Sequence, residues 1–463
     1  MKTMKTMKTI GILRLRDICL LLVLLSLALS CGSDDNGMDC PDPTNANCNP
    51  TLSSVAPVTG PKHTQVTITG ENFGTDATKV SVSFNGTPGE VLGVTDREVT
   101  VKVPVGANTG PITMEVDGFD LTGPKFVYEL TYTVETFAGT PGEEGFLDGS
   151  GTVAQFNRPY DLVMDSKGNL FVADFGNNAI RKITPSGQVT TFAGDSGGRQ
   201  GEGNGQFYRP HGLAIDSDDN IYVADSRNHR IVKIVPDGDC STIAGGGASG
   251  NVSGDGEFAR FNYPTATLVE EEEGNRALYV SDQNNHAIRK VSLNDGRHTV
   301  STYAGPESIE EGDTNGSLSG ARFSGPWGMA KSGEGTILLA DYGNHRIRVI
   351  DQDAGTVGTF AGGEHGHVGD VPRSQARFWG PTDISMAGDG NIYIADGLNH
   401  CIRQIDPDGH VTTIAGNPRF GGHKDGSGDV AEFNFPAGLL YGGEGEIYIT
   451  DSKNHAIRKI TID

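Results

Sequence analysis

Basic residues, cysteines and long apolar runs are scarce in this chain of 463 residues, and each shortage excludes a class of function. The sequence has 36 Lys and Arg against 59 Asp and Glu, a formal charge of −23. A surface this acidic repels the phosphates of nucleic acid and anionic lipid headgroups, so we expect neither as a partner. The six cysteines include no Cys-x-x-Cys pair, which argues against a zinc–thiolate site.

The apolar run near the N-terminus is too short for a comfortable transmembrane helix. It extends from Ile18 to Ser30, thirteen residues interrupted only by serine, and follows five basic residues. A spanning helix needs about 20 apolar residues, whereas a run of this length is typical of a signal-peptide core. We therefore predict that residues 1–30 are a targeting segment.

The end of this run resembles a bacterial lipoprotein signal. In LALSCGSDD, small residues precede Cys31 and a polar acidic stretch follows it, although Leu29 stands where a small residue is more usual. The Ser-Asp-Asp resembles the export signal of Bacteroides-like surface lipoproteins. The resemblance implies lipidation at Cys31, an outer-membrane anchor exposed at the cell surface, and membrane contact only through that lipid. A plain secretory signal with an incidental cysteine is the alternative.

Residues 31–50 contain almost no apolar side chains and predict a flexible tether. Cys40 and Cys48 lie eight residues apart in it and are a candidate disulfide in an oxidising compartment. Cys240 and Cys401 lie in different repeats, and we expect them to be buried single thiols.

A separate module follows the tether. Alternating runs at 51–74, 80–86, 99–104 and 111–116, divided by turn residues, predict a small β-sandwich. The order Pro-x-x-Gly-Pro, Val-Thr-Ile-Thr-Gly-Glu-Asn-Phe-Gly and Val-Pro-x-Gly resembles an IPT/TIG immunoglobulin-like domain over residues 51–130. Such domains usually serve as spacers or docking modules.

Beyond this module the chain repeats one segment six times. The copies are ADFGNNAIRKI at 173–183, ADSRNHRIVKI at 224–234, SDQNNHAIRKV at 281–291, ADYGNHRIRVI at 340–350, ADGLNHCIRQI at 395–405 and TDSKNHAIRKI at 450–460. Their aspartates are 51 to 59 residues apart. A nearly constant period of this length is typical of a repeat architecture.

Each repeat has four short runs rich in Val, Ile, Phe and Tyr, which predict four strands joined by turns. Four-stranded sheets arranged radially form a β-propeller. The Phe-x-x-Pro, Tyr-Val-Ala-Asp-x-x-Asn-x-x-Ile and Lys-Ile elements resemble the NHL-repeat family over residues 133–463. The resemblance implies a six-bladed propeller, so the predicted fold class is all-β.

The segment TVETFAG at 133–139 precedes the first Phe-x-x-Pro entry, and the last repeat ends without such a strand. We therefore expect 133–139 to be the outer strand of the last blade, beside Ile460, so that the two ends of the chain close the ring.

Residues that all repeats share are expected to serve the fold, because each blade has the same packing problem. The aspartate and the asparagine three positions later occur in all six copies and are expected to hydrogen-bond the turn between strands two and three. Histidine follows that asparagine in five copies: His229, His286, His345, His400 and His455. One blade apart around a wide ring, these histidines cannot converge on one metal ion, so we expect them to be structural as well.

The links from one blade to the next are long and rich in Gly and Asp, and they share one face of the ring, which makes that face the candidate binding surface. Its Asp-Gly clusters are candidate calcium ligands, yet none matches the spaced calcium-loop pattern, so turn chemistry is the preferred interpretation and no cofactor is predicted. On the opposite face, Glu270 to Glu273 is expected to be a solvated charge run.

The repeats differ just after the entry proline, where strand one meets the central channel. Both tryptophans are expected at this rim of the channel. The candidate ligand-binding residues are the divergent side chains here together with the tryptophans: Tyr160, Asp161, His211, Trp327, Trp379 and Asp383. Aromatic faces beside carboxylates suit sugar rings, although packing of the entry turn is an equally good explanation for any one of them.

Two classes of function follow. The first is a non-catalytic envelope lipoprotein that binds a glycan, a peptide or an envelope protein on the loop-rich face. The alternative is a metal-dependent lyase or hydrolase, as in some NHL-like and six-bladed propellers. A catalytic ion needs about three protein ligands, for which only Asp161, His211 and Asp383 are available. A third hypothesis is that the protein is a scaffold for another envelope protein.

Overall fold

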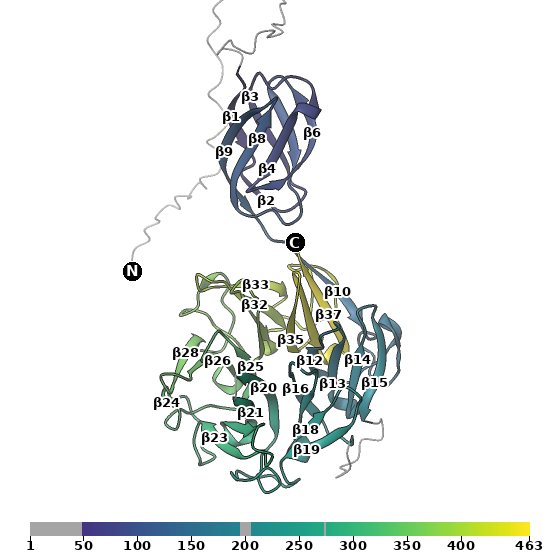
Figure 1. The fold of residues 1–463 in the computed structure, drawn as a ribbon, viewed down its shortest axis with the longest axis vertical. Helices are drawn as coiled ribbons and strands as arrows, with labels where there is room; N and C mark the ends of the chain where they lie inside the picture. The colour runs from purple at the N-terminus through teal and green to yellow at the C-terminus, as the bar shows by residue number, and fades with distance from the viewer. Residues whose placement is uncertain (1–48, 195–204, 273–274) are drawn as a thin grey trace, which may run out of the picture.

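The computed structural model describes residues 49–194, 205–272 and 275–463 (Figure 1). The predicted targeting segment, most of the tether, Cys31, Cys40 and Cys48 lie outside the described residues. Within these ranges the structure is built from β-strands. The helices there are three-residue 3-10 turns, none long and apolar enough to cross a membrane.

The first module is a sandwich of two sheets, as its alternating pattern predicts. One sheet has the order β1-β3-β7-β6 and the other β2-β9-β8-β4-β5. The strands are β1 (Thr51–Ala56), β2 (Thr59–Gly60), β3 (Gln65–Glu71), β4 (Val80–Phe84), β5 (Thr87–Pro88), β6 (Glu90–Thr95), β7 (Glu98–Lys102), β8 (Gly110–Val116) and β9 (Phe119–Tyr128). Alternate residues such as Val66, Ile68, Val99 and Val101 meet between the sheets and form a fully buried core.

The rest of the chain forms six sheets arranged in a ring (Figure 1). Each sheet has four main strands, and the innermost ones are β12 (Pro159–Met164), β16 (Pro210–Ile215), β20 (Pro264–Glu272), β25 (Pro326–Lys331), β30 (Pro381–Met386) and β35 (Pro436–Gly443). Each inner strand contacts the inner strand of the next blade, and β35 contacts β12. The propeller is therefore a closed ring.

The second and third strands of each blade are buried on both faces because neighbouring blades cover them. The second strands are β13 (Leu170–Asp174), β17 (Ile221–Asp225), β21 (Asn275–Asp282), β26 (Thr336–Asp341), β31 (Ile392–Asp396) and β36 (Glu446–Asp451). The third strands are β14 (Ala179–Ile183), β18 (Arg230–Ile234), β22 (Ala287–Ser292), β27 (Arg346–Asp351), β32 (Cys401–Ile405) and β37 (Ala456–Ile462). In β17 every residue is buried, which accounts for its run of successive apolar positions.

The outer strands complete the blades. They are β15 (Gln188–Gly194), β19 (Cys240–Ala244), β23 (Val300–Ala304), β28 (Thr356–Gly362), β33 (His410–Gly416) and β10 (Tyr132–Ala138). Two-residue strands on the links extend four of these edges: β11 (Gly149–Ser150), β24 (Gly316–Ser317), β29 (Val371–Pro372) and β34 (Gly426–Ser427). Cys240 and Cys401 are free thiols as expected, although Cys240 is only partly buried.

Strand β10 closes the ring, as the sequence predicts. It pairs antiparallel with β37, so that Val134 lies opposite Ile460 and Glu135 opposite Lys459, whose side chains form an ion pair at 3.0 Å. At the junction with the sandwich, Thr131 and Asp463 exchange two backbone hydrogen bonds, and Lys62 of the sandwich forms an ion pair with the Asp463 side chain. The chain terminus is thus held beside the strand that closes the ring.

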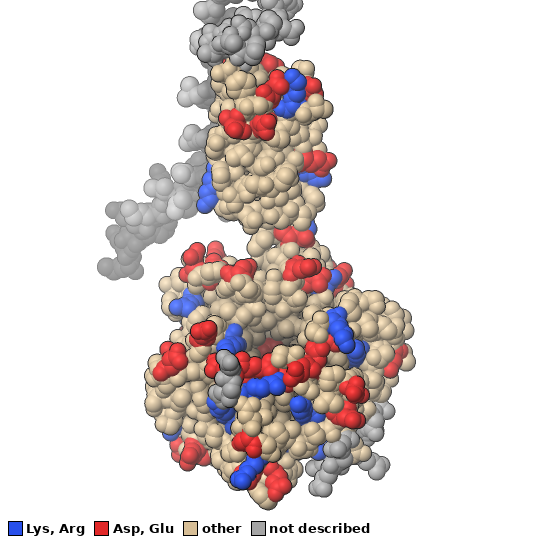
Figure 2. Space-filling model, viewed as in Figure 1, with Lys and Arg blue, Asp and Glu red and all other residues tan. Residues whose placement is uncertain are grey.

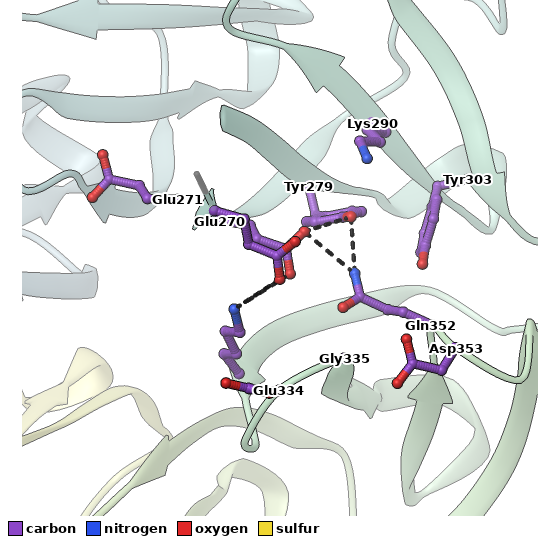
Figure 3. A pocket seen from close by; sticks show the side chains of 11 residues that line it. Glu270, Glu271, Tyr279, Lys290, Tyr303, Glu334, Gly335, Gln352 and Asp353 are labelled. Atoms are coloured by element: carbon purple, nitrogen blue, oxygen red, sulfur yellow. Dashed lines mark hydrogen bonds and ion pairs between the residues drawn. The ribbon is translucent and has the colours of Figure 1, made fainter. Parts of the chain in front are cut away.

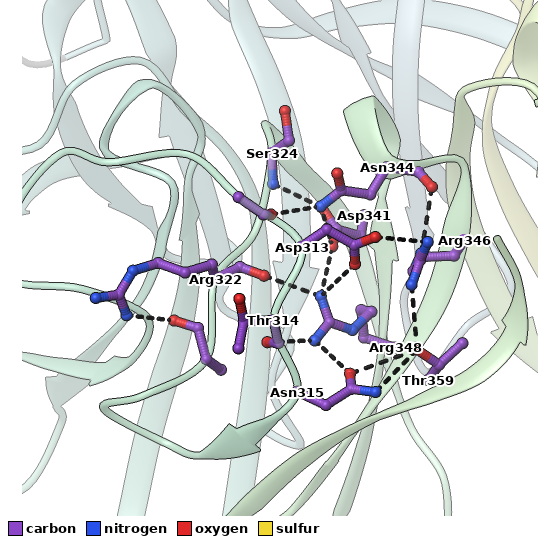
Figure 4. Close-up of polar contacts among 12 residues, drawn as sticks. Asp313, Thr314, Asn315, Arg322, Ser324, Asp341, Asn344, Arg346, Arg348 and Thr359 are labelled. Carbon is purple, nitrogen blue, oxygen red and sulfur yellow. Dashed lines mark hydrogen bonds and ion pairs between the residues drawn. The ribbon is translucent and has the colours of Figure 1, made fainter. Parts of the chain in front are cut away.

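The repeated aspartate is the centre of a buried polar network, seen for the fourth blade in Figure 4. Asp341 accepts a hydrogen bond from the Ser324 backbone amide at 2.8 Å, from Asn344 Nδ2 at 2.9 Å and from Arg348 Nη1 at 2.8 Å. Arg348 also donates to the Arg322 carbonyl oxygen at 3.0 Å. One carboxylate therefore joins the entry turn, the turn after strand two and the third strand.

The prediction that aspartate and asparagine hydrogen-bond this turn is confirmed in all six blades. The Asn–Asp side-chain pairs are Asn177–Asp174, Asn228–Asp225, Asn285–Asp282, Asn344–Asp341, Asn399–Asp396 and Asn454–Asp451. The arginine partner was not anticipated. It is Arg181, Arg289, Arg348, Arg403 or Arg458 in five blades, each fully buried.

The second blade keeps the ion pair by a different route. Val232 occupies the arginine position there, and Arg230, two residues earlier, reaches Asp225 Oδ2 at 2.8 Å. The fourth blade has arginine at both positions, Arg346 and Arg348. A buried carboxylate thus has an arginine partner in every blade, because leaving such a charge unpaired costs several kcal/mol.

The repeated histidines connect neighbouring blades, which supports their structural interpretation. His286 adopts the left-handed conformation, and its Nδ1 accepts a hydrogen bond from the Gly325 amide of the next blade at 3.1 Å. His229, His345, His400 and His455 bind the next blade in the same way. In the first blade Asn178 Oδ1 accepts this bond from the Arg209 amide.

Replacing Arg289 by valine is expected to lower the free energy of unfolding by about 3–5 kcal/mol, because Asp282 loses its counter-ion in the core. The matched variant Arg348→Val should cost only about half as much, since Arg346 stands where Arg230 neutralises Asp225 in the second blade. Urea unfolding of both variants measures this difference. Equal losses would show that the second arginine does not substitute.

Replacing His286 by asparagine is expected to change stability by less than about 0.5 kcal/mol, because asparagine accepts the same bond in the first blade and tolerates the left-handed conformation. His286→Ala removes the acceptor and should cost about 1–2 kcal/mol. Thermal unfolding distinguishes the two, and a larger loss for asparagine than for alanine would contradict this role.

Candidate functional site

The inner strands surround a central channel with a cavity of about 270 Å³. Most of the residues that line it have apolar side chains, such as Leu213, Ala266 and Leu439. Asp161 and Asp383 lie at the start of their inner strands, near the links, and Lys331 lies at the far end of β25.

On the side of the links, an aromatic plug made of Tyr160, His211, Trp327 and Phe435 fills the centre of the ring. The ring of His211 lies 4.4 Å from that of Tyr160 and 5.0 Å from that of Trp327, whose centre is 6.0 Å from that of Phe435. Trp327 Nε1 donates a hydrogen bond to His211 Nε2 at 2.9 Å. The rings pack against one another at tilted angles, and they come from four different blades.

The plug holds His211 in its neutral form. Burial lowers the pKa of His211 from 6.5 to about 3, and a hydrogen bond with the Thr265 backbone only partly opposes this. The Nε2 lone pair is occupied by the Trp327 indole, so neither a proton nor a metal ion can take it without breaking that bond. Burial also raises the pKa of the Tyr160 hydroxyl to about 12.

The two channel aspartates bind backbone amides of the neighbouring blade. Asp161 Oδ2 accepts from the Leu213 amide at 2.7 Å, and Asp383 Oδ2 from the Leu439 amide at 2.8 Å. Burial raises the pKa of Asp161 to about 7, against the opposing effect of its amide donors. Burial and then the charge of Asp161 raise the pKa of Asp383 well above its usual range. The two carboxylates therefore interact across the channel.

Glycine is required where the aspartates approach the next inner strand. A Cβ atom at Gly328 would lie 2.2 Å from Asp383 Oδ1, and one at Gly438 would lie 3.0 Å from Asp161 Oδ1. The divergent positions after the entry proline thus form one interlocking set. Their sequence differences reflect packing at the centre of the ring as well as any ligand.

The structure separates the six predicted site residues into three groups. Tyr160, His211 and Trp327 belong to the plug, Asp161 and Asp383 to the channel, and Trp379 to the surface, with 44% of it exposed. The expectation that both tryptophans lie at the rim is wrong for Trp327, which is 8% exposed because its indole fills the centre of the propeller. Across residues 49–194, 205–272 and 275–463, no three His, Cys, Asp or Glu side chains are placed to hold a metal ion.

Trp379 forms an exposed rim cluster with residues of the link between the fourth and fifth blades. The His365 ring lies 6.2 Å from Trp379 and 5.7 Å from His345. Glu364 and Arg377, both well exposed, form an ion pair at 2.7 Å. The cluster therefore offers an aromatic face, imidazoles, a carboxylate and a guanidinium to solvent.

The links also carry the exposed apolar surface of the ring. In its described residues, the large hydrophobic side chains most exposed to solvent are Leu147, Val153, Val252, Phe258, Ile309, Trp379, Phe420 and Val430, and each lies on a link. Blade turns on the opposite face carry none of them. An apolar surface confined to one set of loops is typical of a binding face.

The opposite face is charged, and the sequence prediction for its glutamates is wrong only at Glu270: Glu271 and Glu272 are exposed as predicted, and Glu273 lies outside the described residues. Glu270 is not solvated, as was expected, but 4% exposed, because Tyr279 on the neighbouring strand donates a hydrogen bond to it at 2.9 Å. Figure 2 shows this face, where acidic and basic side chains surround a hollow in the middle of the ring. The one signal of this burial that the sequence offered was the unusually long hairpin β20–β21, which carries Glu270 inward.

Two kinds of module are present in this chain. Residues 50–134 match the IPT/TIG domain, and four segments match the NHL repeat, at 156–183, 207–234, 323–350 and 433–460. Among curated proteins, the chain is similar to Protein SUPPRESSOR OF QUENCHING 1, chloroplastic, of Arabidopsis thaliana, with 29% identity over 58% of this chain and 27% of that protein. The chain spans less than half the length of the first curated relatives it matches.

Two solved structures from Bacteroides are similar over most of the chain. A protein of unknown function from Bacteroides thetaiotaomicron VPI-5482 has 23% identity and a TM-score of 0.59, covering 91% of this chain and 99% of that one. An auxiliary nutrient binding protein from Bacteroides ovatus ATCC 8483 has 22% identity and a TM-score of 0.56, covering 89% and 98%. At these identities the likeness shows the shared all-β fold.

The plug gives the protein a defined pH dependence. Unfolded His211 gains a proton below pH 6.5 while the folded side chain stays neutral down to about pH 3, so His211 makes a destabilising contribution that grows as pH falls through this window, opposite in sign to that of Asp161. The His211 contribution to the slope is at most about 1.4 kcal/mol per pH unit. His211→Phe should lack this contribution in urea unfolding between pH 4 and 7. An unchanged slope would show that His211 titrates normally.

Proposed function

We propose that this chain is a non-catalytic binding protein of a bacterial cell envelope, which captures a glycan on the link face of its propeller. The observation that carries the proposal is the distribution of exposed apolar side chains: in the described ring, all the large ones lie on the links. Exposed apolar side chains gathered on one face are typical of an interaction site, a ligand-binding site among them.

The rim cluster at Trp379 is the centre of the proposed site. A sugar ring presents C–H groups on its faces and hydroxyl groups at its edge. The exposed indole of Trp379 offers the flat apolar surface, and Glu364, Arg377 and His365 offer acceptors and donors beside it. This combination favours a glycan over an apolar peptide.

The metal-dependent enzyme is less well supported by the same residues. His211 would have to give up its hydrogen bond from Trp327 before it joined Asp161 and Asp383 at an ion. Both aspartates already accept amide hydrogen bonds that fix the neighbouring inner strands. Their present bonds serve the closure of the ring centre.

The envelope location rests on the N-terminal sequence. In the proposal, Cys31 carries the lipid that anchors the protein in the outer membrane, residues 32–50 act as the tether and the IPT/TIG domain acts as a spacer. The similar Bacteroides ovatus protein, described as an auxiliary nutrient binding protein, fits a role in capturing a nutrient outside the cell. In this arrangement the propeller is the part presented to the ligand.

A glycan array with the purified protein is expected to identify a polysaccharide ligand, and Trp379→Ala should weaken its binding about thirty-fold, the effect of losing about 2 kcal/mol at a central aromatic anchor. Phe119→Ala, which removes an exposed aromatic ring from the sandwich, is the matched control and should leave Kd within about twofold. Titration calorimetry measures both variants.

Two outcomes would contradict the proposal. An array without any bound polysaccharide would exclude the glycan, and the proposed ligand class would then be wrong. Equal weakening by Trp379→Ala and Phe119→Ala would place the ligand away from the rim cluster.

A further inference from the structure

A second pocket lies on the face opposite the links, between the third and fourth blades. It has a volume of about 670 Å³ and is shown in Figure 3. Its lining side chains come from the β20–β21 hairpin, from β22 and β23, and from the turns that follow β25 and β27. Because these elements face away from the links, the pocket is separate from the rim cluster.

Glu270 is held in this pocket by one of its two carboxylate oxygens. Tyr279 donates to Oε2 at 2.9 Å, and Gln352 Nε2 donates to the Tyr279 hydroxyl oxygen at 2.9 Å. The other oxygen, Oε1, is buried and receives no hydrogen bond from the described residues. Lys331 Nζ lies 3.6 Å from Oε1, an ion pair without a hydrogen bond. A carboxylate oxygen that is buried without a donor is costly, so the site lacks one donor.

The pocket also has more negatively charged than positively charged side chains. Five carboxylates line it, from Glu270, Glu271, Glu272, Glu334 and Asp353, against the ammonium groups of Lys290 and Lys331. Arg276 pairs with Glu271, and Lys331 is shared between Glu270 and Glu272 at 3.6 Å from each. Among the described residues Glu334 and Asp353 form no ion pair, and both lie at the edge of the pocket.

We propose that this pocket binds an alkylammonium group, as a free diamine or as a lysine side chain, which donates its hydrogen bond to Glu270 Oε1. The acidic groups are spread around the pocket, and no three of the described ones are placed for a metal ion. That arrangement suits an organic cation with a body of several atoms. The rings of Tyr279 and Tyr303 already hold the ammonium group of Lys290, 5.4 and 5.9 Å from their centres, so the ligand cation is assigned to Glu270 and not to these rings.

Lys331 sets the affinity of the pocket. The Lys331 ammonium group compensates part of the negative charge of the pocket. It is nevertheless too far from Glu270 Oε1 to donate a hydrogen bond. A bound ammonium group therefore competes electrostatically with Lys331 while it supplies the missing donor. Removing Lys331 should strengthen binding, whereas neutralising Glu270 should weaken it.

Titration calorimetry of the purified protein with 1,4-diaminobutane at low salt tests the proposal. Glu270→Gln is expected to weaken binding about ten- to hundred-fold, the value of a hydrogen bond to a charged group. Lys331→Met is expected to strengthen it several-fold, and the sandwich control Glu98→Gln to leave it unchanged. Thermal unfolding checks that each variant is folded. If Glu270→Gln does not fold, the stronger diamine binding expected for Lys331→Met tests the proposal instead.

The neutral isostere 1,4-butanediol and a Gly-Lys-Gly peptide blocked at both ends complete the experiment. Binding of the diamine but not of the diol supports recognition of charge. Tighter binding of the peptide than of the diamine identifies a lysine side chain as the source of the ammonium group, and the reverse identifies a free amine. No binding of either cation to the wild-type protein and Lys331→Met, or equal binding of the diol, would overturn the proposal.

Discussion

The buried ion pair between the aspartate that ends strand two and an arginine of strand three is the constraint on which the propeller depends. In the fourth blade Asp341 receives three hydrogen bonds, and Arg348 passes the connection on to the carbonyl oxygens of the incoming link. A charge so deeply buried must be compensated, and compensation fixes the entry turn, the strand-two turn and the link at once. The second blade shows how strict this requirement is, because Arg230 replaces the missing arginine from a different position.

With each blade fixed in this way, the two faces of the ring are free to differ. On the link face, the plug fills the centre and leaves the exposed apolar side chains on the surrounding loops. On the other face, the β20–β21 hairpin extends beyond its counterparts and buries Glu270 beside Tyr279. The two proposed sites therefore differ in chemistry: an aromatic surface suited to a sugar ring, and an acidic pocket suited to an organic cation.

Particular residues show why the candidate site was only partly predictable. Tyr160, His211 and Trp327 were singled out because they differ between repeats, but divergence does not distinguish a residue that contacts a ligand from one that fills an asymmetric centre. Trp327 is buried because aromatic rings from three other blades pack against it, among them His211 as a hydrogen-bond acceptor. Glu270 was missed for the opposite reason, because a run of glutamates in a turn is ordinarily solvated.

The sequence alone determined the all-β class, the two modules, the closing strand beside Ile460 and the structural use of the repeated Asp, Asn and His. These follow from local turn chemistry and from a period that is repeated six times, and both can be recognised along the chain. Tertiary structure decided which divergent side chains are buried, which arginine neutralises each aspartate, and where Glu270 lies. Those outcomes depend on contacts between blades, and no local pattern specifies how far a side chain reaches across a closed ring.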